Sequence, residues 1–455
     1  MQTHSETLAE FTCGLQPSAI PESVRELARQ HLTDSIGVAL AGRTCAFAGS
    51  ALAAISCLGK GEEGTVIGSP LRLPIQNAAW INGIAIHSDD FDDTAFEPTI
   101  HPSSVVVPAA LAIGEKVDAK ADEVLAAMVT GYEILLRLGY VAPGRFLAKG
   151  FHATSVCGVF AAAAISAQLL KLSPLQARHA LGIAGSMSSG IIEYLGDGSS
   201  MKRFHPGWGA MSGITAALLA RAGADGPRFV LEGEHGLYRS FLQGDEVNLD
   251  RLSQGLGSEW LTREIAFKMY PMCHFIHAFV DCVLDLQHRH MIPLAQIETI
   301  ECFIAAQQVP IVCEPLEHKK RPRTPYEAKF SLPYNIAAAL LDGCVNQTTH
   351  LPERISRAEA VDLAARVKYV EDARSLYPRS FSGRVRIRLR DGHSYEIGHA
   401  APIGSASRPP GEDALAAKFL HNADQSGFIR AHELLKRLQT FHGEASLREL
   451  LALVT

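Results

Sequence analysis

The sequence predicts a mainly α-helical protein in which a large all-α domain, built from both chain ends, encloses a smaller inserted α+β lid domain. Three observations predict this fold: helical periodicity up to about residue 264, strand patterns after about residue 290, and helical periodicity again from residue 412. A chain of 455 residues also exceeds what one hydrophobic core usually organises. The expected boundaries are 1–264 and 408–455 for the helical domain and 265–407 for the lid domain.

Helices are expected throughout the first part of the chain. Residues 21–41 and 122–138 carry apolar side chains at helical spacing. Residues 156–170 and 211–222 are so rich in Ala that they predict central helices, apolar on all sides and closely packed. Small residues at helix contacts favour a compact α bundle over alternating strands and helices.

Strand patterns appear in the inserted part. Residues 297–304 are rich in β-branched side chains, and 384–389 alternate apolar residues with arginines. An Asp391-Gly392 turn then leads into residues 394–397, which predicts a hairpin. We expect its arginines to be solvated on a wet, basic face rather than to line an active site.

Composition excludes several functional classes. Hydrophobic residues make up 47% of the chain and charged residues 20%, which is ordinary for a soluble globular protein. A net charge of -6 argues against nucleic-acid binding, and no apolar run is long enough for a membrane helix. The nine cysteines are scattered without a CxxC pair, and residues 1–10 lack the apolar core of a signal peptide. We expect free thiols and a cytoplasmic protein.

The first group of candidate functional residues is an acidic run within His87–Thr94, followed by His101. Four carboxylates in five residues repel one another and must find cations, helix ends or protons. Three interpretations stay open: a metal site such as the DDxxD run of terpenoid synthases, helix capping with solvation, and a catalytic cluster in which an Asp orients a His. An aromatic content of 7% weakens the terpenoid interpretation, because carbocation chemistry needs an aromatic-lined cage.

Two further groups lie ahead of predicted buried helices. His152 precedes one of them, where the helix dipole favours the neutral imidazole that a general base needs, although a capping histidine is an equal alternative. The loop at 196–209 combines Gly and Ser with Lys202, Arg203 and His205, which suits binding of a carboxylate or phosphate. Solvation of the Lys-Arg pair is the competing interpretation.

The last groups lie in the inserted domain. His274 and His277 are three residues apart on one predicted helical face, but no third metal ligand has the usual spacing. Tyr334 precedes a helix that ends near residue 342, where a tyrosine more often packs than acts as an acid.

Taken together, these blocks resemble the MmgE/PrpD family, which includes 2-methylcitrate dehydratase, cis-aconitate decarboxylase and iminodisuccinate epimerase. The matching blocks are Asp-Phe-Asp-Asp-Thr with a later His-Pro-Ser, Gly-Phe-His, Met-Lys-Arg-Phe-His-Pro-Gly, Lys-x-x-Pro with a following His, and Ala-Lys-Phe-Ser-Leu-Pro-Tyr. The resemblance runs from about residue 5 to residue 440. It implies a homodimer of helical and lid domains, without metal or organic cofactor.

The resemblance also implies the site residues: Asp90, Thr94, His101, His152, Lys202, Lys268 and Tyr334, with either His274 or His277. The lysines, with Arg203 nearby, would hold substrate carboxylates and balance the charge of a carbanionic state. His101 and His152 would be acid and base, Asp90 would set a tautomer, and Thr94 and Tyr334 would orient the substrate. Decarboxylases of the family use a histidine two residues after the Pro, where this chain has Cys273.

The expected activity is that of a lyase, first a hydro-lyase on a citrate-like or other hydroxy-polycarboxylate. A decarboxylase or epimerase of a similar acid is the near alternative. A non-catalytic dimeric binder is the alternative from another class.

Overall fold

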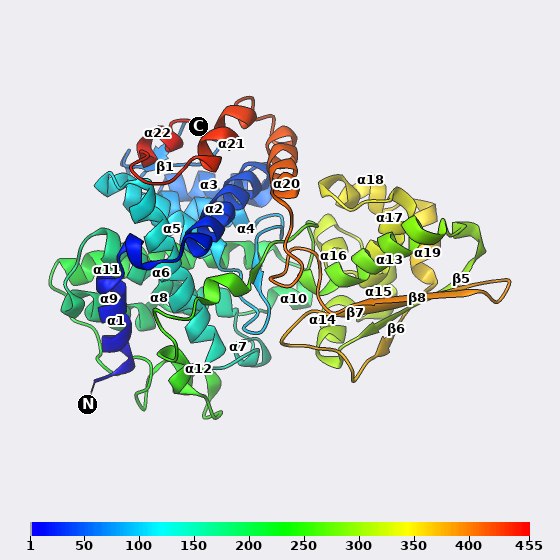
Figure 1. Cartoon of the computed structure of the whole chain (residues 1–455), viewed down its shortest axis with the longest axis horizontal. Helices are drawn as coiled ribbons and strands as arrows, with labels where there is room; N and C mark the ends of the chain where they lie inside the picture. Colours follow the sequence, from blue (N-terminus) through cyan, green and yellow to red (C-terminus); the bar gives the residue numbers. More distant parts are fainter. Residues whose placement is uncertain (1) are drawn as a thin grey trace. The chain divides into compact units, whose positions relative to one another are not determined.

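A computed structural model of the chain describes residues 2–455 (Figure 1). The fold is mainly helical, as predicted. The chain divides into two compact units. The first consists of the chain up to Ile265 together with Gly411–Thr455, and the second is Ala266–Pro410.

The first unit is a helical bundle. Its helices are α1 (His4–Gly14), α2 (Glu22–Gly42), α3 (Ala46–Ser56), α4 (Ile75–His87), α5 (Ser103–Val117), α6 (Ala121–Tyr140), α7 (Arg145–Ala148), α8 (Ala153–Leu169), α9 (Pro174–Met187), α10 (Tyr194–Asp197), α11 (Phe204–Arg221), α12 (Leu237–Leu242), α20 (Glu412–Gln425), α21 (Ala431–Gln439) and α22 (Leu447–Leu451). Short strands β1 (Gly64–Thr65), β2 (Arg72–Leu73) and β3 (Thr94–Ala95) interrupt it, and β4 (Ile265–Ala266) follows α12.

Helix α8 is central to this bundle. Every residue of α8 except Gln168 is buried, and the helix packs against α5, α6, α9 and α11. The contact with α11 requires small residues, because a Cβ added at Gly213 would lie 2.4 Å from the Val159 carbonyl oxygen. The Ala-rich pattern therefore correctly predicted a closely packed core helix.

No single helix within residues 2–455 is long and apolar enough to span a membrane. Helices α2 and α3 reach that length and apolarity only when they are taken together, and a bend of 92° separates them.

The C-terminal segment completes the first unit. Helix α20 packs against α2, and α21 contacts both of them, so that α2 (blue) lies beside α20 and α21 near the red end of the chain in Figure 1. Lys418 of α20 and Asp34 of α2 form a buried ion pair with 2.7 Å between Nζ and Oδ1. This ion pair links the C-terminal helix α20 to helix α2 in the N-terminal part of the chain.

The second unit combines a sheet with short helices. Its sheet has the order β6-β5-β7-β8, with β5 parallel to β6 and antiparallel to β7. The strands are β5 (Ile297–Ile304), β6 (Val367–Glu371), β7 (Gly383–Leu389) and β8 (Ser394–His399). The helices are α13 (His277–His290), α14 (Val309–Val312), α15 (Leu316–Lys320), α16 (Pro325–Lys329), α17 (Leu332–Asp342), α18 (Pro352–Ile355) and α19 (Ala358–Ala365).

The predicted hairpin is confirmed as β7 and β8, which pair in antiparallel register. Its arginines are not a purely basic face, however. Arg384 and Arg386 both bind Glu396, and Arg384 also binds Asp372. Since these acidic partners come from other strands and loops, the alternating pattern within 384–389 could not indicate them.

Candidate active site

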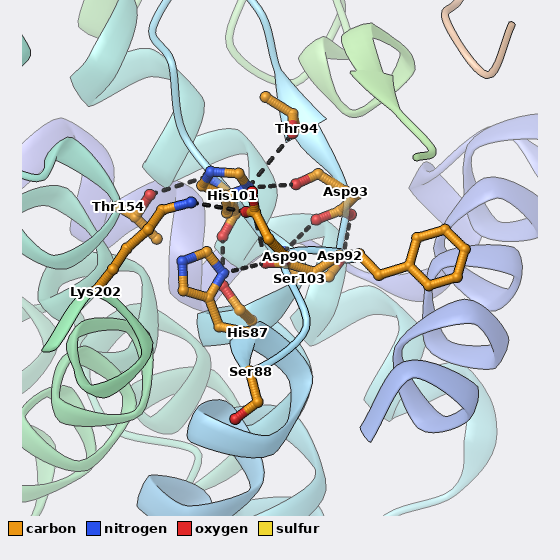
Figure 2. A network of polar contacts seen from close by, with 12 residues as sticks. His87, Ser88, Asp90, Asp92, Asp93, Thr94, His101, Ser103, Thr154 and Lys202 are labelled. Carbon is orange, nitrogen blue, oxygen red and sulfur yellow. Dashed lines mark hydrogen bonds and ion pairs between the residues drawn. The ribbon is translucent and has the colours of Figure 1, made fainter. Parts of the chain in front are cut away.

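The loop after α4 carries the acidic run, and it turns sharply where the helix ends. His87 is the last residue of α4, and Asp90 adopts a left-handed backbone conformation with φ at 52°. Asp tolerates this conformation better than most residues do. The Asp90 carboxylate lies 2.7 Å from Lys202 Nζ, and both side chains are buried (Figure 2). The acidic run after α4 therefore lies in contact with the loop at 196–209, through the ion pair of Asp90 and Lys202.

The two following carboxylates are also buried and partnered. Asp92 Oδ2 accepts a hydrogen bond from His87 Nδ1 at 2.7 Å. Asp93 accepts hydrogen bonds from the backbone N–H and hydroxyl of Ser103, at the start of α5, and lies 2.8 Å from His31 Nδ1. The capping-with-solvation interpretation of this run is wrong in its solvation part for Asp90, Asp92 and Asp93, because all three are buried. Asp90 lies against Lys202, Asp92 against His87, and Asp93 against the start of α5.

His101 is held in one orientation by backbone groups. Its ring nitrogen Nδ1 lies 3.0 Å from the Asp93 carbonyl oxygen, and the backbone N–H of His101 donates to Thr154 Oγ1 at 3.0 Å. A carbonyl oxygen can only accept, so Nδ1 carries the proton and Nε2 carries the lone pair in the neutral ring. Thr94 Oγ1 lies 3.4 Å from the same Nδ1. The Asp93 carbonyl oxygen is the acceptor that sets this tautomer of His101, and the predicted role of Asp90 in setting a tautomer stays a prediction.

His152 is the residue that precedes α8, as predicted, and its Nδ1 lies 3.1 Å from Nδ1 of His205. Burial lowers the pKa of His152 well below its usual value, and nearby His205, His87 and Lys202 lower it further. Burial also lowers the pKa of His205 to about 4. His205 is therefore neutral near pH 7 and adds no positive charge to the loop at 196–209, where the sequence groups it with Lys202 and Arg203.

His87 is a member of this cluster to which the sequence analysis assigned no role. Its ring centroid lies 4.7 Å from that of His101 and 5.8 Å from that of His152. Burial lowers its pKa, Asp92 opposes that shift, and Lys202 adds to it. Its position five residues before Asp92 was the only available signal, and that spacing alone does not distinguish it from a core histidine.

Arg203 lies beside this group on the short turn Ser200–Arg203. Its side chain is half-buried, and one guanidinium nitrogen lies 3.4 Å from Ser200 Oγ. The solvation interpretation of the Lys-Arg pair is thus wrong for Lys202, which is buried.

The remaining predicted residues lie in the second unit. Lys268 is fully buried there. The ring centroids of His274 and His277 lie 4.3 Å apart, where the 3₁₀ turn that contains His274 runs into α13, which begins at His277. Tyr334 donates its hydroxyl to the Thr349 carbonyl oxygen and packs in a small apolar cluster, and burial raises its pKa to about 12.

Two overlapping sets of side chains in the first unit could hold a metal ion. One set is His87, His101 and His152, and the other replaces His152 with Asp90 and Asp92. In each set the candidate ligand atoms lie within 4.8 Å of one another. Imidazoles beside carboxylates suit transition metals, whereas a site for Mg²⁺ is normally built from oxygen ligands.

The fold and this cluster define a mainly helical protein whose buried neutral imidazoles, carboxylates and ammonium group are suited to acid–base chemistry on a small charged molecule. Models of the MmgE/PrpD N-terminal domain and the MmgE/PrpD C-terminal domain match residues 6–250 and 270–439. The chain therefore belongs to the MmgE/PrpD family.

Several relatives of the chain are cis-aconitate decarboxylases. The chain is 27% identical to the cis-aconitate decarboxylase of Mus musculus, over 93% of this chain and 88% of the relative. It is 28% identical to the cis-aconitate decarboxylase of Aspergillus terreus, over 90% and 87%. The corresponding Homo sapiens protein is 27% identical over 93% and 89%.

Proposed function

We propose that this protein is a lyase that acts on a citrate-like polycarboxylate by proton transfer at a carbon next to a carboxylate, and that within this class it is a hydro-lyase. The observation that carries the proposal is the cluster of His101 and His152 beside the buried Lys202–Asp90 pair. Membership of the MmgE/PrpD family and the similarity to cis-aconitate decarboxylases support the same substrate class.

The main energetic problem of such a reaction is the negative charge that develops when the C–H bond breaks. An ammonium group in a buried site stabilises that charge far more than water would, because it is already oriented and the local dielectric is low. Lys202 donates a hydrogen bond to Asp90 from its ammonium group. This contact orients the cation in the buried site.

The imidazoles supply the proton transfers. One neutral ring accepts the proton from carbon at Nε2, and the electron pair of the broken C–H bond forms the new double bond. That step expels hydroxide from the neighbouring carbon, and the second ring, which must enter the step as an imidazolium, donates its Nε2 proton to the hydroxide, so that water leaves and this ring becomes neutral. His101 has its Nε2 lone pair set by the Asp93 carbonyl, and His152 has it when its Nδ1–H donates to His205.

Decarboxylation is the second candidate, and the names of the relatives favour it. In that reaction the C–C bond breaks, carbon dioxide leaves, and an imidazolium donates its proton to the carbon left behind. We place dehydration first because Cys273 stands where the resemblance expects a histidine in decarboxylases. Cys273 is buried beside Pro271 and Met272 and cannot replace an imidazole as a proton donor of similar pKa.

The proposal includes a cofactor-free reaction, a homodimer and a cytoplasmic location. Metal-free catalysis is consistent with the chemistry just described, since each step uses an imidazole or an ammonium group of the chain. Sedimentation velocity measures the oligomeric state directly, and a monomer would contradict that part.

The test is turnover in D₂O with citrate, 2-methylcitrate, cis-aconitate and tartrate isomers, followed by ¹H and ¹³C NMR. A hydro-lyase should exchange deuterium at one carbon next to a carboxylate and release no carbon dioxide. A decarboxylase should release carbon dioxide and leave deuterium where the carboxylate was. Turnover without carbon-bound deuterium in either direction would refute the proton-transfer mechanism for both reactions.

A further inference from the structure

The buried imidazole cluster has a geometry that proton transfer alone does not require. His87 ends α4, His101 precedes α5 and His152 precedes α8, so three separate helices place these rings together. Their candidate ligand nitrogens lie within 4.8 Å of one another, and all three side chains are buried. Three convergent imidazoles are the ligand set of many zinc centres.

The Nδ1 side of each ring already has a partner. His87 Nδ1 donates to Asp92, His101 Nδ1 donates to the Asp93 carbonyl, and His152 Nδ1 lies against His205. Histidines that ligate metals through Nε2 almost always donate Nδ1–H to a carboxylate, a carbonyl or a similar acceptor, which sets the tautomer. The Asp92–His87 pair has the arrangement of a carboxylate, a histidine and a metal in such a site.

His87 Nε2 provides a second and independent observation. This nitrogen is buried, and within residues 2–455 it has no hydrogen-bond partner. A buried acceptor without a hydrogen bond is destabilising, so such a group in a folded protein needs an explanation. Because Nδ1 donates to Asp92, the lone pair of the neutral ring is on Nε2, where it is available to a cation.

The surrounding charges limit which cation can bind. Asp90 and Asp92 compensate part of a dication's charge, whereas Lys202 opposes it. A tetrahedral zinc site needs nitrogen atoms about 3.4 Å apart, so the rings would move inward slightly. Imidazole ligands select Zn²⁺, Co²⁺ or Cu²⁺ over Mg²⁺ and Ca²⁺, which require oxygen-rich sites.

We propose that His87, His101 and His152 form a binding site for a transition-metal dication of the Zn²⁺ type, and that the ion inhibits the protein by occupying the imidazoles. The site is inhibitory because a metal-bound Nε2 can no longer accept or donate a proton. Metal binding itself does not depend on the reaction proposed above, since it can be measured without substrate.

The test is a titration of the purified full-length protein, stripped with EDTA and dialysed, with Co²⁺ and Zn²⁺. Co²⁺ reports its ligands by visible absorption, and calorimetry measures the stoichiometry of Zn²⁺. We expect one Zn²⁺ per chain, a Co²⁺ spectrum typical of nitrogen ligands in tetrahedral geometry, and no heat with Mg²⁺. His87→Ala should weaken Zn²⁺ binding at least 100-fold, and Asp92→Asn should weaken it about 10- to 100-fold.

Matched controls locate the ion. His235→Ala, at an exposed histidine of the same unit, should leave binding unchanged. If His87→Ala does not fold, judged by circular dichroism, His101→Gln gives the same test with Co²⁺ absorption as the readout. Unchanged Zn²⁺ affinity in the folded variants, or loss of binding only in a His274→Ala/His277→Ala variant, would overturn the proposal. So would the absence of any binding by the unmodified protein.

The inhibitory part has its own readout. Zn²⁺ should lower turnover in proportion to occupancy, and EDTA should restore it fully. Turnover of the chelated enzyme tests the proposed function, and loss of that turnover on addition of Zn²⁺ tests the inhibitory site. Either proposal can therefore fail while the other holds. Occupied sites with undiminished turnover would refute the inhibitory role.

Discussion

The buried pair of Lys418 and Asp34 allows a quantitative test of how the C-terminal segment supports the acidic loop. Lys418 Nζ lies 2.7 Å from Asp34 Oδ1 and donates to the Phe91 carbonyl oxygen at 3.0 Å. It also lies 3.9 Å from the centroid of the Phe91 ring. Phe91 stands between Asp90 and Asp92, so one ammonium group connects α20, α2 and the loop of the candidate active site.

Lys418→Met removes the cation and leaves a buried carboxylate and a buried carbonyl without their donor. Breaking a buried ion pair by removal of one partner costs about 3–5 kcal/mol. We expect a loss of that size in the free energy of unfolding of the first unit. Lys418→Met/Asp34→Leu should recover at least about 2 kcal/mol, because replacing both partners with apolar groups removes the unpaired charge.

The assay is urea unfolding followed by tryptophan fluorescence. Trp80, Trp208 and Trp260 are the three tryptophans of the chain, and all of them lie in the first unit, so the signal reports that unit alone. Lys436→Met, at an exposed position of α21, is the control and should change stability by less than about 0.5 kcal/mol.

The pH dependence of the Lys418→Met variant adds a check with a definite sign. Burial raises the pKa of Asp34, and loss of Lys418 removes the cation that opposes the shift. An acid whose pKa is higher in the folded state binds more protons there, so folding becomes less favourable as pH rises. The variant should be more stable near pH 5 than near pH 8. A loss below about 1 kcal/mol, or a double variant no more stable than the single one, would refute this reasoning.

Three further predictions concern the site itself. His152→Gln should keep the fold but lower kcat about 100-fold or more, and near-normal kcat in the folded variant would return His152 to a capping role. In the unmodified protein, the acid limb of the pH–rate profile should lie well below pH 6.5, because burial lowers the pKa of His152. Lys202→Met should cost about 3 kcal/mol of transition-state stabilisation in kcat/KM, whereas Arg386→Met on the hairpin should change little; equal losses would mean that the anion site has been misplaced. Exhaustive EDTA treatment should leave turnover intact, and loss of activity that Mg²⁺ or Zn²⁺ restores would end the cofactor-free interpretation.

Much of the fold follows from local patterns in the sequence. The Ala-rich stretch at 156–170 predicted α8, because a helix that is apolar on all sides is buried on all sides. The alternation in 384–389 predicted β7, because successive side chains of a strand point to opposite faces of the sheet. Helix starts were less predictable. Helix α11 begins at Phe204 rather than near residue 211, because Pro206 is tolerated in the first turn of a helix.

Residues of the candidate site could be proposed from the sequence one by one, but their arrangement could not. The order of the motifs identified Asp90, His101, His152 and Lys202 through a resemblance to a family. The resemblance carried no information about which of these groups touch. It therefore assigned to Asp90 the role of setting a tautomer, whereas the structure pairs Asp90 with Lys202 and sets Nδ1 of His101 by the Asp93 carbonyl.

The sequence by itself determined the mainly helical class, the hairpin and the set of chemical groups available for acid–base catalysis. Only the tertiary structure decided their electrostatic state. His205 reads as a cationic neighbour of Lys202 in the sequence, yet burial lowers its pKa to about 4. His87 reads as an ordinary helix residue, yet it contacts two other imidazoles. Charge and protonation depend on desolvation and on partners from distant segments, and neither is encoded in local periodicity.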